Sequence, residues 1–377
     1  MQKTGQAGNT TEVQNTENKA PHSHQYSGLS LLVIGTETGV FRPETEAAKR
    51  IFAYGTHFKE VHIVVVSGPH EYRGTSVGNV HLYPATGSRF SRIMRALSII
   101  RTIPHYDIVT AQDPFENGFV AWHAARRGNV PLHLQIHTDF LSPAFARHSF
   151  MNRIRVILAQ FLLRRADRIR VVSSCIRVNM MRLNLIAPVA VLPIFVDVDR
   201  FRNVADQNLA VRFAQFRTKL LLVSRLEPEK NPCLALKSFA NAAPQSSCLI
   251  ILGKGSEQTH LIQLAKELNI SDRVFFEGEK DAAPYYAISD IVLITSRYEG
   301  YGRVFIEASA ARKPVLSTDV GIARESGATV ASEKDFARAL AEWFTSGPRT
   351  NSLKSYPYHS FDEYVRAYCD DIARSCE

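Results

Sequence analysis

Residues 290–319, DIVLITSRYEGYGRVFIEASAARKPVLSTD, decide the fold class of this chain. The apolar run 290–295 predicts a buried strand, 303–311 predicts a helix rich in small residues, and 314–317 predicts a second strand. A strand, a helix and another strand in succession form one unit of a parallel α/β sheet. The loop EGYG between the first strand and the helix contains one glutamate, and a second glutamate follows on the helix. Both stand near the carboxyl end of a strand, where open α/β sheets bind their ligands.

The same alternation of strands and helices extends in both directions along the chain. Upstream, we predict strands at 29–35, 60–68, 106–113, 131–137, 168–173 and 189–193, and helices at 44–54, 91–103, 116–127 and 150–165. Closer to the opening stretch, we predict strands at 219–224, 248–252 and 273–277, and helices at 232–243, 260–268 and 283–288. Strands that are apolar along their whole length indicate sheets covered on both faces. The sequence therefore predicts an α/β fold of two doubly wound, Rossmann-like parallel-sheet domains that face each other across a cleft.

The length of 377 residues favours two domains over one. We place the first domain at 29–200 and the second at 218–355, joined by a linker, 201–217, that carries no strand signal. Residues 1–28 are poor in large apolar side chains, which predicts a disordered tail and not a signal peptide. The last segment, 356–377, has helical periodicity and no strand after it.

The net charge of +9 suits an anionic partner, which could be nucleic acid, an anionic membrane surface or a phosphorylated ligand. We find no zinc-finger spacing, ribonucleoprotein aromatic motif or basic block, so we expect no nucleic-acid partner. No run approaches the ~18 apolar residues that span a bilayer. The five cysteines lack CxxC spacing, which fits a reducing cytoplasm and argues against structural zinc. We therefore expect a cytoplasmic protein.

Glu299 and Glu307 are the first candidates for a binding site. On a helix that starts near Gly302, Glu307 shares the inward side with Val304, and its side chain leans back toward the preceding loop. An unpaired buried carboxylate is costly, so an inward glutamate favours a function. Gly300 and Gly302 let the backbone approach a ligand closely, and the N-terminus of the helix favours an anion. The alternative is that both glutamates are solvated surface charges.

Arg225 and Lys230 follow a predicted strand in the segment 221–232, LLVSRLEPEKNP. Two cations at a strand end beside a helix start suit a diphosphate, because arginine offers a planar fork and lysine a compact point charge. The alternative is that Arg225 pairs on the surface with Glu227 or Glu229.

Three further signals are weaker. Gly253 and Gly255 follow a strand, but the third glycine of a dinucleotide-binding fingerprint is missing, so a tight turn is the alternative. His137 ends a strand, where it is either a group that faces the cleft or a satisfied structural histidine. Asp197 and Asp199 have the carboxylate spacing of metal-dependent sugar-nucleotide enzymes, but they fall at the end of the first domain. We interpret this pair as structural and predict no metal site.

Together these stretches resemble the retaining GT-B glycosyltransferases of family 4, a group 1 family. The matching segments are VSRLEPEKN, LGKGSE, RVFFEG, VLPIFVDVDRF and the long block 285–321. The resemblance covers about 30–345 and is strongest over 219–321. It implies a hexosyltransferase that moves a sugar from a nucleotide-diphosphate-sugar donor to a glycan or lipid-linked acceptor with retention of configuration, in cell-envelope glycan biosynthesis. The first domain would face the acceptor, the second would bind the donor, and the C-terminal helix would return to the first domain.

The resemblance also implies roles for the charged candidates. Glu299 matches the glutamate that contacts the donor sugar, and Glu307 matches the one that binds the ribose hydroxyls. Arg225 and Lys230 match the residues that hold the pyrophosphate and neutralise the leaving nucleotide. Because these cations and a helix N-terminus stabilise the leaving group, the family generally needs no bound metal, and we expect no cofactor besides the nucleotide sugar.

The remaining roles follow from the same resemblance. Backbone groups of Tyr301 and Gly302 would complete the donor pocket, and His137 would lie near the transferred sugar. The catalytic residues that we expect are Glu299, Lys230, Arg225 and His137. The donor-binding residues that we expect are Arg225, Lys230, Gly253, Gly255, Glu299, Gly300, Tyr301, Gly302 and Glu307.

The chain departs from the family pattern in two places. Its first loop carries a single glycine, Gly39, where many members have two, and IARESGATV after 321 makes Glu325 an uncertain counterpart of a family glutamate. Two rival functions therefore stay open, a sugar-nucleotide epimerase with the same fold and a silent nucleotide-sugar-binding protein. Release of free nucleotide diphosphate in the presence of an acceptor distinguishes a transferase from both.

Two predicted helical stretches, 88–103 and 151–170, are both basic and apolar. They predict a peripheral contact of the protein with an anionic membrane at its inner face. The alternative is that their apolar sides pack in the core and their arginines are solvated.

Overall fold

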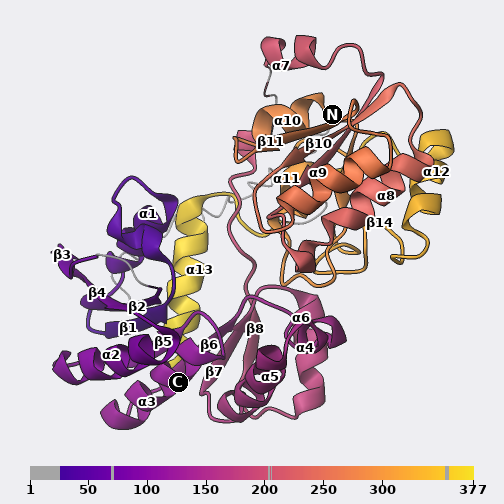
Figure 1. The fold of residues 1–377 in the computed structure, drawn as a ribbon. Helices are drawn as coiled ribbons and strands as arrows, with labels where there is room; N and C mark the ends of the chain where they lie inside the picture. The colour runs from indigo at the N-terminus through magenta and orange to yellow at the C-terminus, as the bar shows by residue number, and fades with distance from the viewer. Residues whose placement is uncertain (1–25, 69–71, 203, 205, 353–355) are drawn as a thin grey trace, which may run out of the picture.

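The computed structural model describes residues 26–68, 72–202, 204, 206–352 and 356–377, which form two lobes around two separate sheets (Figure 1). The predicted tail 1–28 lies almost entirely outside the described residues. The strands of the first sheet are β1 (Ser30–Gly35), β2 (Glu60–Ser67), β3 (Thr75–Val77), β4 (Val80–Thr86), β5 (Ile108–Ala111), β6 (Leu132–Ile136), β7 (Arg168–Val171) and β8 (Val189–Val191). Their order is β3-β4-β2-β1-β5-β6-β7-β8, and only β3 runs antiparallel to its neighbour among these strands.

Helices cover both faces of this sheet, as its apolar strands require. They are α1 (Glu46–Gly55), α2 (Arg89–Thr102), α3 (Glu116–Gly128), α4 (Pro143–His148), α5 (Phe150–Leu163) and α6 (Ser174–Met180). Every residue of β1, SLLVIG, is buried, and so is every residue of β6, LHLQI. These central strands are covered on both sides, which explains why their apolar runs are continuous.

The second sheet repeats the pattern with strands β9 (Thr218–Val223), β10 (Ser247–Leu252), β11 (Val274–Gly278), β12 (Ile291–Ile294), β13 (Val315–Ser317) and β14 (Thr329–Val330). Its order is β11-β10-β9-β12-β13-β14, and all the pairings are parallel. Its helices are α8 (Pro232–Ala242), α9 (Gln258–Glu267), α10 (Ala283–Ile288), α11 (Arg303–Ala310) and α12 (Phe336–Ser346). The predicted fold class, two Rossmann-like parallel-sheet domains, is confirmed.

The structure adds elements that the strand and helix predictions omitted. Strands β3 and β4 form a hairpin at the edge of the first sheet, and α12 packs on α8 in the second domain. The predicted linker, 201–217, contains the short helix α7 (Gln207–Arg212). Phe213 and Phe216 after this helix are buried in edge-to-face contact with Phe275 of β11. The segment between the sheets is therefore partly packed onto the second domain.

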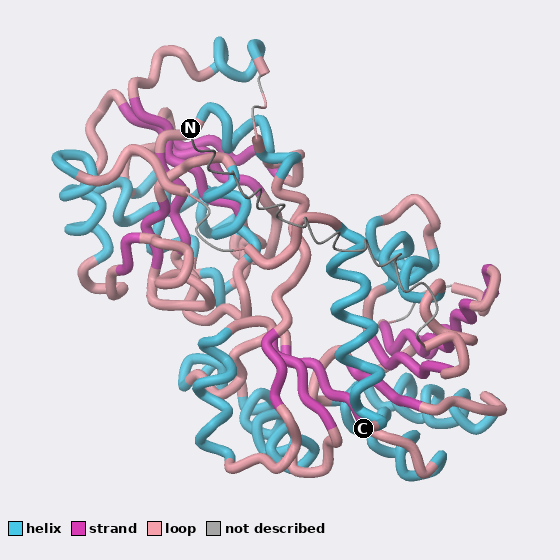
Figure 2. Tube along the Cα trace, turned by 180° about the vertical axis from the view of Figure 1, so that it is seen from behind, coloured by secondary structure: helices cyan, strands magenta, loops and turns pink. Residues whose placement is uncertain are grey.

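Helix α13 (Phe361–Ala373) leaves the second domain and lies along the first (Figures 1 and 2). Its Asp371 carboxylate lies 3.1 Å from His133 Nε2 of β6 and accepts a hydrogen bond of 2.7 Å from Arg168 Nε of β7. Tyr368 accepts a hydrogen bond of 2.8 Å from the buried Gln135 amide. The C-terminal helix is thus part of the core of the first domain, and the chain crosses between the domains twice.

Candidate active site between the two domains

A cavity of about 630 Å³ lies between the carboxyl ends of the two sheets. The first domain contributes His137, and the second contributes the ends of β9 and β12, the loop 295–302 and the start of α11. A neighbouring cavity of about 390 Å³ extends along the second domain. Arg225 and Arg303 line both cavities, so the two form one elongated site at the place where open α/β sheets bind ligands.

Lys230 and Glu299 form an ion pair in the wall of the larger cavity. Lys230 ends a short 3-10 helix after β9, and Glu299 lies in the loop after β12. Lys230 Nζ lies 2.5 Å from Glu299 Oε1, which also accepts a 2.7 Å hydrogen bond from Ser296 Oγ. Thr295 Oγ1 donates to the Lys230 carbonyl oxygen at 2.9 Å and ties the two loops together. Lys230 therefore compensates the charge of a mostly buried carboxylate, and both groups remain in contact with the cavity.

Arg225 satisfies both interpretations that the sequence left open. Its NH2 donates a 2.9 Å hydrogen bond to Glu229 Oε1, which is the surface pair given above as the alternative. The side chain is nevertheless 69% exposed and lines both cavities. The pairing partner Glu229 is on the same loop, so it positions the guanidinium without removing it from the site.

Glu307 lies on the inward face of α11, as the helical spacing predicts, and is buried. Its Oε2 accepts a 2.9 Å hydrogen bond from the Tyr286 hydroxyl, and its Oε1 lies 3.7 Å from Arg303 NH2. Burial raises the pKa of Glu307, while Arg303 and the Tyr286 hydroxyl act in the opposite direction. Glu307 lines the smaller cavity and Glu299 lines the larger one, so the two glutamates face different ends of the elongated site.

Gly300 brings the two domains into direct backbone contact. A Cβ atom at Gly300 would lie 1.9 Å from the His137 carbonyl oxygen. Ser173 Oγ, after β7, donates a 2.7 Å hydrogen bond to the Gly300 carbonyl oxygen. Both contacts cross from one domain to the other, so glycine at this position is required for the close approach of the domains.

His137 follows β6 and faces the larger cavity from the first domain. Its Nε2 lies 3.3 Å from Gln135 Oε1, which also accepts a 2.9 Å hydrogen bond from Arg170 NH1. Burial, with the positive charges of Arg170 and Arg50 nearby, lowers the pKa of His137 to about 3. The imidazole is therefore neutral near neutral pH and can exchange hydrogen bonds with a hydroxyl group of a ligand.

The start of α11 forms one wall of both cavities. Gly302 precedes the helix with φ +82°, a left-handed conformation that glycine adopts without strain. Val304, in the first turn, lines both cavities, so backbone N–H groups of a helix N-terminus border the site. Tyr301 is buried and also lines the larger cavity. The predicted residues Gly300, Tyr301 and Gly302 thus lie together with Glu299.

Gly253 and Gly255 serve chiefly to pack one loop on another. Gly253 has φ +129°, and a Cβ atom there would lie 1.9 Å from the Ser224 carbonyl oxygen. A Cβ atom at Gly255 would lie 2.2 Å from the Leu226 carbonyl oxygen. Gly253 lines the smaller cavity, whereas Gly255 supports the loop after β9 from behind. The tight turn given as the alternative is therefore present, and it positions the segment that carries Arg225.

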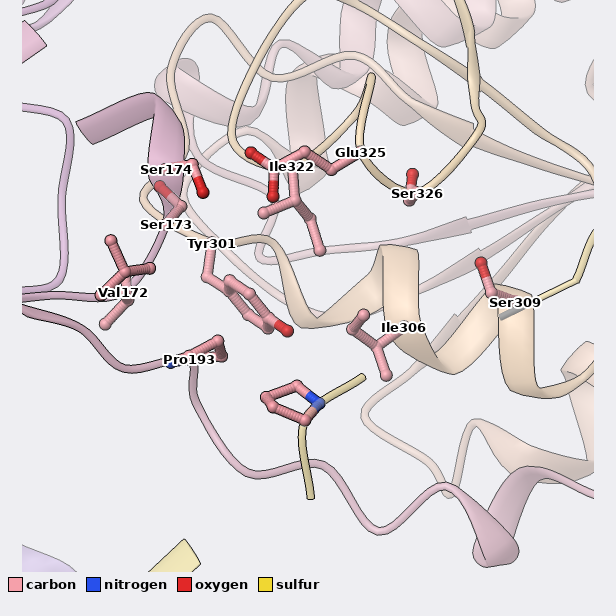
Figure 3. A pocket seen from close by; sticks show the side chains of 12 residues that line it. Val172, Ser173, Ser174, Pro193, Tyr301, Ile306, Ser309, Ile322, Glu325 and Ser326 are labelled. Atoms are coloured by element: carbon pink, nitrogen blue, oxygen red, sulfur yellow. The ribbon is translucent and has the colours of Figure 1, made fainter. Parts of the chain in front are cut away.

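Glu325 lies at a different place, in a small cavity of about 110 Å³ between the domains. Figure 3 shows its side chain on one side of this cavity and the ring of Tyr301 across from it, with Ser173 and Pro193 from the first domain. Burial raises the pKa of Glu325. Tyr301 separates this interdomain cavity from the larger one, since it lines both.

Two residues of the site, Arg303 and Tyr286, were not predicted from the sequence. Arg303 lines both cavities, and its position as the first residue of a helix after a glycine-rich loop was the available signal. Tyr286 is the hydrogen-bond partner of Glu307 and lies 21 residues away on α10, so no local pattern connects them.

Asp197 and Asp199 bond locally. Asp197 Oδ1 accepts a 3.4 Å hydrogen bond from the Arg200 backbone N–H, and Asp199 pairs with Arg202 at 2.8 Å. Neither aspartate lines the two cavities of the elongated site. In the part of the chain that the structure describes, no helix combines the length and the apolarity needed to cross a membrane.

The fold of this chain is similar to that of solved structures. Sucrose-phosphate synthase from Thermosynechococcus elongatus superposes with a TM-score of 0.72 at 17% identity, covering 91% of this chain and 94% of that one. HepE from Anabaena, in complex with UDP-glucose, superposes with a TM-score of 0.67 at 19% identity, covering 91% and 95%. At this identity the likeness shows the GT-B fold.

Curated relatives match part of their own length. A D-inositol 3-phosphate glycosyltransferase of Saccharomonospora viridis is 30% identical over 238 residues, 58% of this chain and 55% of the relative. An N-acetyl-alpha-D-glucosaminyl L-malate synthase of Bacillus anthracis is 35% identical over 104 residues, 27% of each protein. The chain thus spans about half the length of the first relative and about a quarter of the second.

Family models match both domains. Residues 55–200 match the model of Glycosyltransferase Family 4, and residues 210–359 match that of Glycosyl transferases group 1. The two matches follow each other along the chain, each covering most of one domain, and the solved structures share the fold, so the chain belongs to the group 1 glycosyltransferases of the GT-B fold.

Proposed function

We propose that the protein transfers a sugar from a nucleotide-diphosphate-sugar donor, bound mainly by the second domain, to an acceptor bound against the first. The observation that carries this proposal is the elongated site itself. It gathers Arg225, the Lys230–Glu299 pair and the N-terminus of α11 opposite His137. A nucleotide sugar has a diphosphate between two sugars. Cations such as Arg225 and Lys230 suit the diphosphate, and carboxylates such as Glu299 and Glu307 can accept hydrogen bonds from the sugar hydroxyls.

Within this proposal, Arg225 and Lys230 hold the diphosphate. Negative charge grows on the departing diphosphate as its bond to the sugar breaks, so cations there stabilise the transition state more than the bound donor. Lys230 lies 2.5 Å from Glu299 and neutralises it, so each group holds the other in position. Such preorganised charges need no reorientation during the reaction.

The carboxylates and the histidine would form hydrogen bonds with the sugar hydroxyls. Glu299 is the group for the hydroxyls of the transferred sugar, and Glu307, with Tyr286 behind it, is the group for the ribose hydroxyls. Neutral His137 offers a hydrogen bond to the transferred sugar from the first domain. Retention of configuration is part of the proposal because it is the expectation from the resemblance to family 4.

The acceptor is a glycan, a lipid-linked sugar or a small anion such as those named in the relatives, inositol phosphate and malate. The test is a panel of nucleotide sugars, first for thermal stabilisation and then for release of nucleotide diphosphate with each acceptor class. A transferase releases the diphosphate only with an acceptor, and NMR of the product reports whether the anomeric configuration is retained. An epimerase would change the sugar without release, and a silent binder would do neither; either result would overturn the proposal.

We also propose that the exposed apolar residues of α2 and α5 contact an anionic membrane. These helices pack on either side of α3, and their exposed large side chains are Phe90, Met94, Phe150, Ile154, Ile157 and Phe161. Four of the six, on α5, follow one another at helical spacing, and Phe90 and Ile157 are 75% and 70% exposed. Neither helix contains an acidic residue, whereas α2 contains four arginines and α5 two.

The positive charge of these helices favours an anionic lipid surface, because each basic residue near such a surface contributes ~1 kcal/mol of binding free energy. Co-sedimentation with phosphatidylserine vesicles should weaken with salt and disappear with neutral lipid. Ile157→Ser should lower vesicle affinity by ~10- to 10²-fold, since burial of one large aliphatic side chain is worth ~1.5–3 kcal/mol. Val211→Ser is the matched control, because Val211 is 73% exposed on the second domain. Equal binding of the two variants would contradict the assignment.

A further inference from the structure

Cys233, Glu257 and His260 form a cluster outside the donor cavities. Cys233 is the second residue of α8, Glu257 immediately precedes α9, and His260 lies in the first turn of α9. Cys233 Sγ lies 3.9 Å from Glu257 Oε2 and 3.8 Å from His260 Nδ1, and the last two atoms lie 3.2 Å apart. Among the described residues this is the only group of three such side chains whose ligand atoms all lie within 4.8 Å of one another.

These separations are close to those of ligands around one tetrahedral ion. With metal–sulfur bonds of ~2.3 Å and metal–nitrogen or metal–oxygen bonds of ~2.0–2.1 Å, tetrahedral geometry places sulfur about 3.5 Å from nitrogen or oxygen. The same geometry places nitrogen about 3.3 Å from oxygen. The observed distances of 3.9, 3.8 and 3.2 Å require shifts of only a few tenths of an ångström. Side-chain rotation alone can provide them, since His260 is largely exposed.

The donor set selects the kind of ion. A thiolate and an imidazole are ligands of zinc and similar transition metals, whereas calcium and magnesium prefer oxygen alone. Three protein ligands leave a fourth position for water. Cys233 and Glu257 stand at the starts of helices of 11 and 10 residues, so both ligands are held by rigid elements.

The cluster is joined to the loop that carries Arg225 and Lys230. The Glu257 backbone N–H donates to the Leu226 carbonyl oxygen at 2.9 Å, and Ser256 Oγ donates to Glu227 Oε2 at 2.7 Å. An ion bound by Cys233 and Glu257 would therefore join the two helix starts on either side of this loop.

We propose that Cys233, Glu257 and His260 bind one zinc-class divalent ion, separate from the donor site, and that the ion braces the loop 225–231. The proposal does not depend on the identity of the donor or on glycosyl transfer. Its readouts are metal binding and protein stability, which can be measured on the protein without substrate.

The experiment uses the full chain, reduced and freed of metal, titrated with zinc alone against a chromophoric chelator. We expect one equivalent of zinc per chain and a higher melting temperature with zinc than without it. Cobalt in place of zinc should give the strong near-ultraviolet absorption of a cobalt–thiolate bond. His260→Ala and Cys233→Ser should each lower the affinity at least about tenfold, because each removes one of three ligands.

The matched control is Cys376→Ser, which removes an exposed thiol outside the cluster and should leave zinc affinity unchanged. His260→Ala keeps the test valid if Cys233→Ser folds poorly, since the His260 side chain is 61% exposed. Absence of stoichiometric binding by the parent protein would overturn the proposal, and so would equal loss of binding in Cys376→Ser.

Discussion

Replacement of Gly300 by alanine should disturb the contact between the two domains and leave donor binding unchanged. The added Cβ would lie 1.9 Å from the His137 carbonyl oxygen, whereas real Cβ atoms stay at least 3.0 Å from such neighbours. The obstructing atom is backbone, so no side-chain rotation relieves the contact. The backbone segments at Gly300 and His137 must therefore move apart by at least about 1.1 Å, the difference between those two distances.

This displacement sets the expected size of the effect. The elongated site is lined by Gly300 and His137 together, so the groups that face donor and acceptor shift relative to each other. A misplacement of about 1 Å can cost ~10²-fold in rate, which corresponds to about 2.7 kcal/mol of activation free energy. Loss of the Ser173 hydrogen bond should cost only ~1 kcal/mol of stability. We expect kcat to fall about a hundredfold while the protein remains folded.

The assay is steady-state release of nucleotide diphosphate with the donor and acceptor found in the panel, together with calorimetric donor affinity. Donor affinity should stay close to that of the parent, because Arg225, Lys230 and Glu307 all belong to the second domain. Gly28→Ala is the control, since nothing lies within 4 Å of a Cβ at Gly28. A Gly300→Ala protein with kcat within about twofold of the parent, a change of under ~0.5 kcal/mol, would refute this reasoning.

Three further predictions concern the donor site. Arg225→Ala and Lys230→Ala should each lower kcat by ~10²–10³-fold in the release assay, and Arg225→Ala is the cleaner test because its side chain is exposed. Burial raises the pKa of Glu307, so its carboxylate form, to which we assign the ribose hydroxyls, is complete above that raised pKa and is lost as pH falls through it. Donor affinity should therefore decline toward acid pH in calorimetry, and Glu307→Gln should remove this pH dependence. Treatment with a chelator followed by one equivalent of zinc should leave turnover nearly unchanged; loss of activity that manganese but not zinc restores would instead implicate Asp197 and Asp199.

The central strands could be predicted because burial on both faces requires a continuous apolar run in the sequence. A parallel strand buried on both faces, such as β10 with SCLIIL, must be apolar along its whole length. The edge hairpin β3–β4 has no continuous apolar run, because all three residues of β3 are exposed and β4 contains Pro84 and mixes buried with partly buried residues. Helix α12 was predictable, since Phe336, Leu340 and Trp343 are buried at helical spacing.

In the site too, features set by one helix could be predicted from the sequence, whereas contacts between separate helices could not. The inward position of Glu307 follows from the period of α11, but its partner Tyr286 comes from another helix and only the fold connects them. The cysteine spacing argues against zinc because it considers sequence neighbours alone. Cys233 and Glu257 are 24 residues apart and meet only because the starts of α8 and α9 lie side by side.

The path of the chain explains why the contact between the domains can be changed without changing donor binding. It crosses between the domains after β8 and again before α13, and α13 is fixed to the first domain by the buried contacts of Asp371. The domains are joined by these two crossings and by contacts that include the Ser173–Gly300 hydrogen bond and the Phe145–Tyr298 ring contact. A change at Gly300 should thus alter kcat with unchanged donor affinity, whereas a change at Arg225 acts within the second domain and should alter both. A double variant whose effects on kcat simply multiply would show that the two changes act independently, since uncoupled sites contribute additively to free energy.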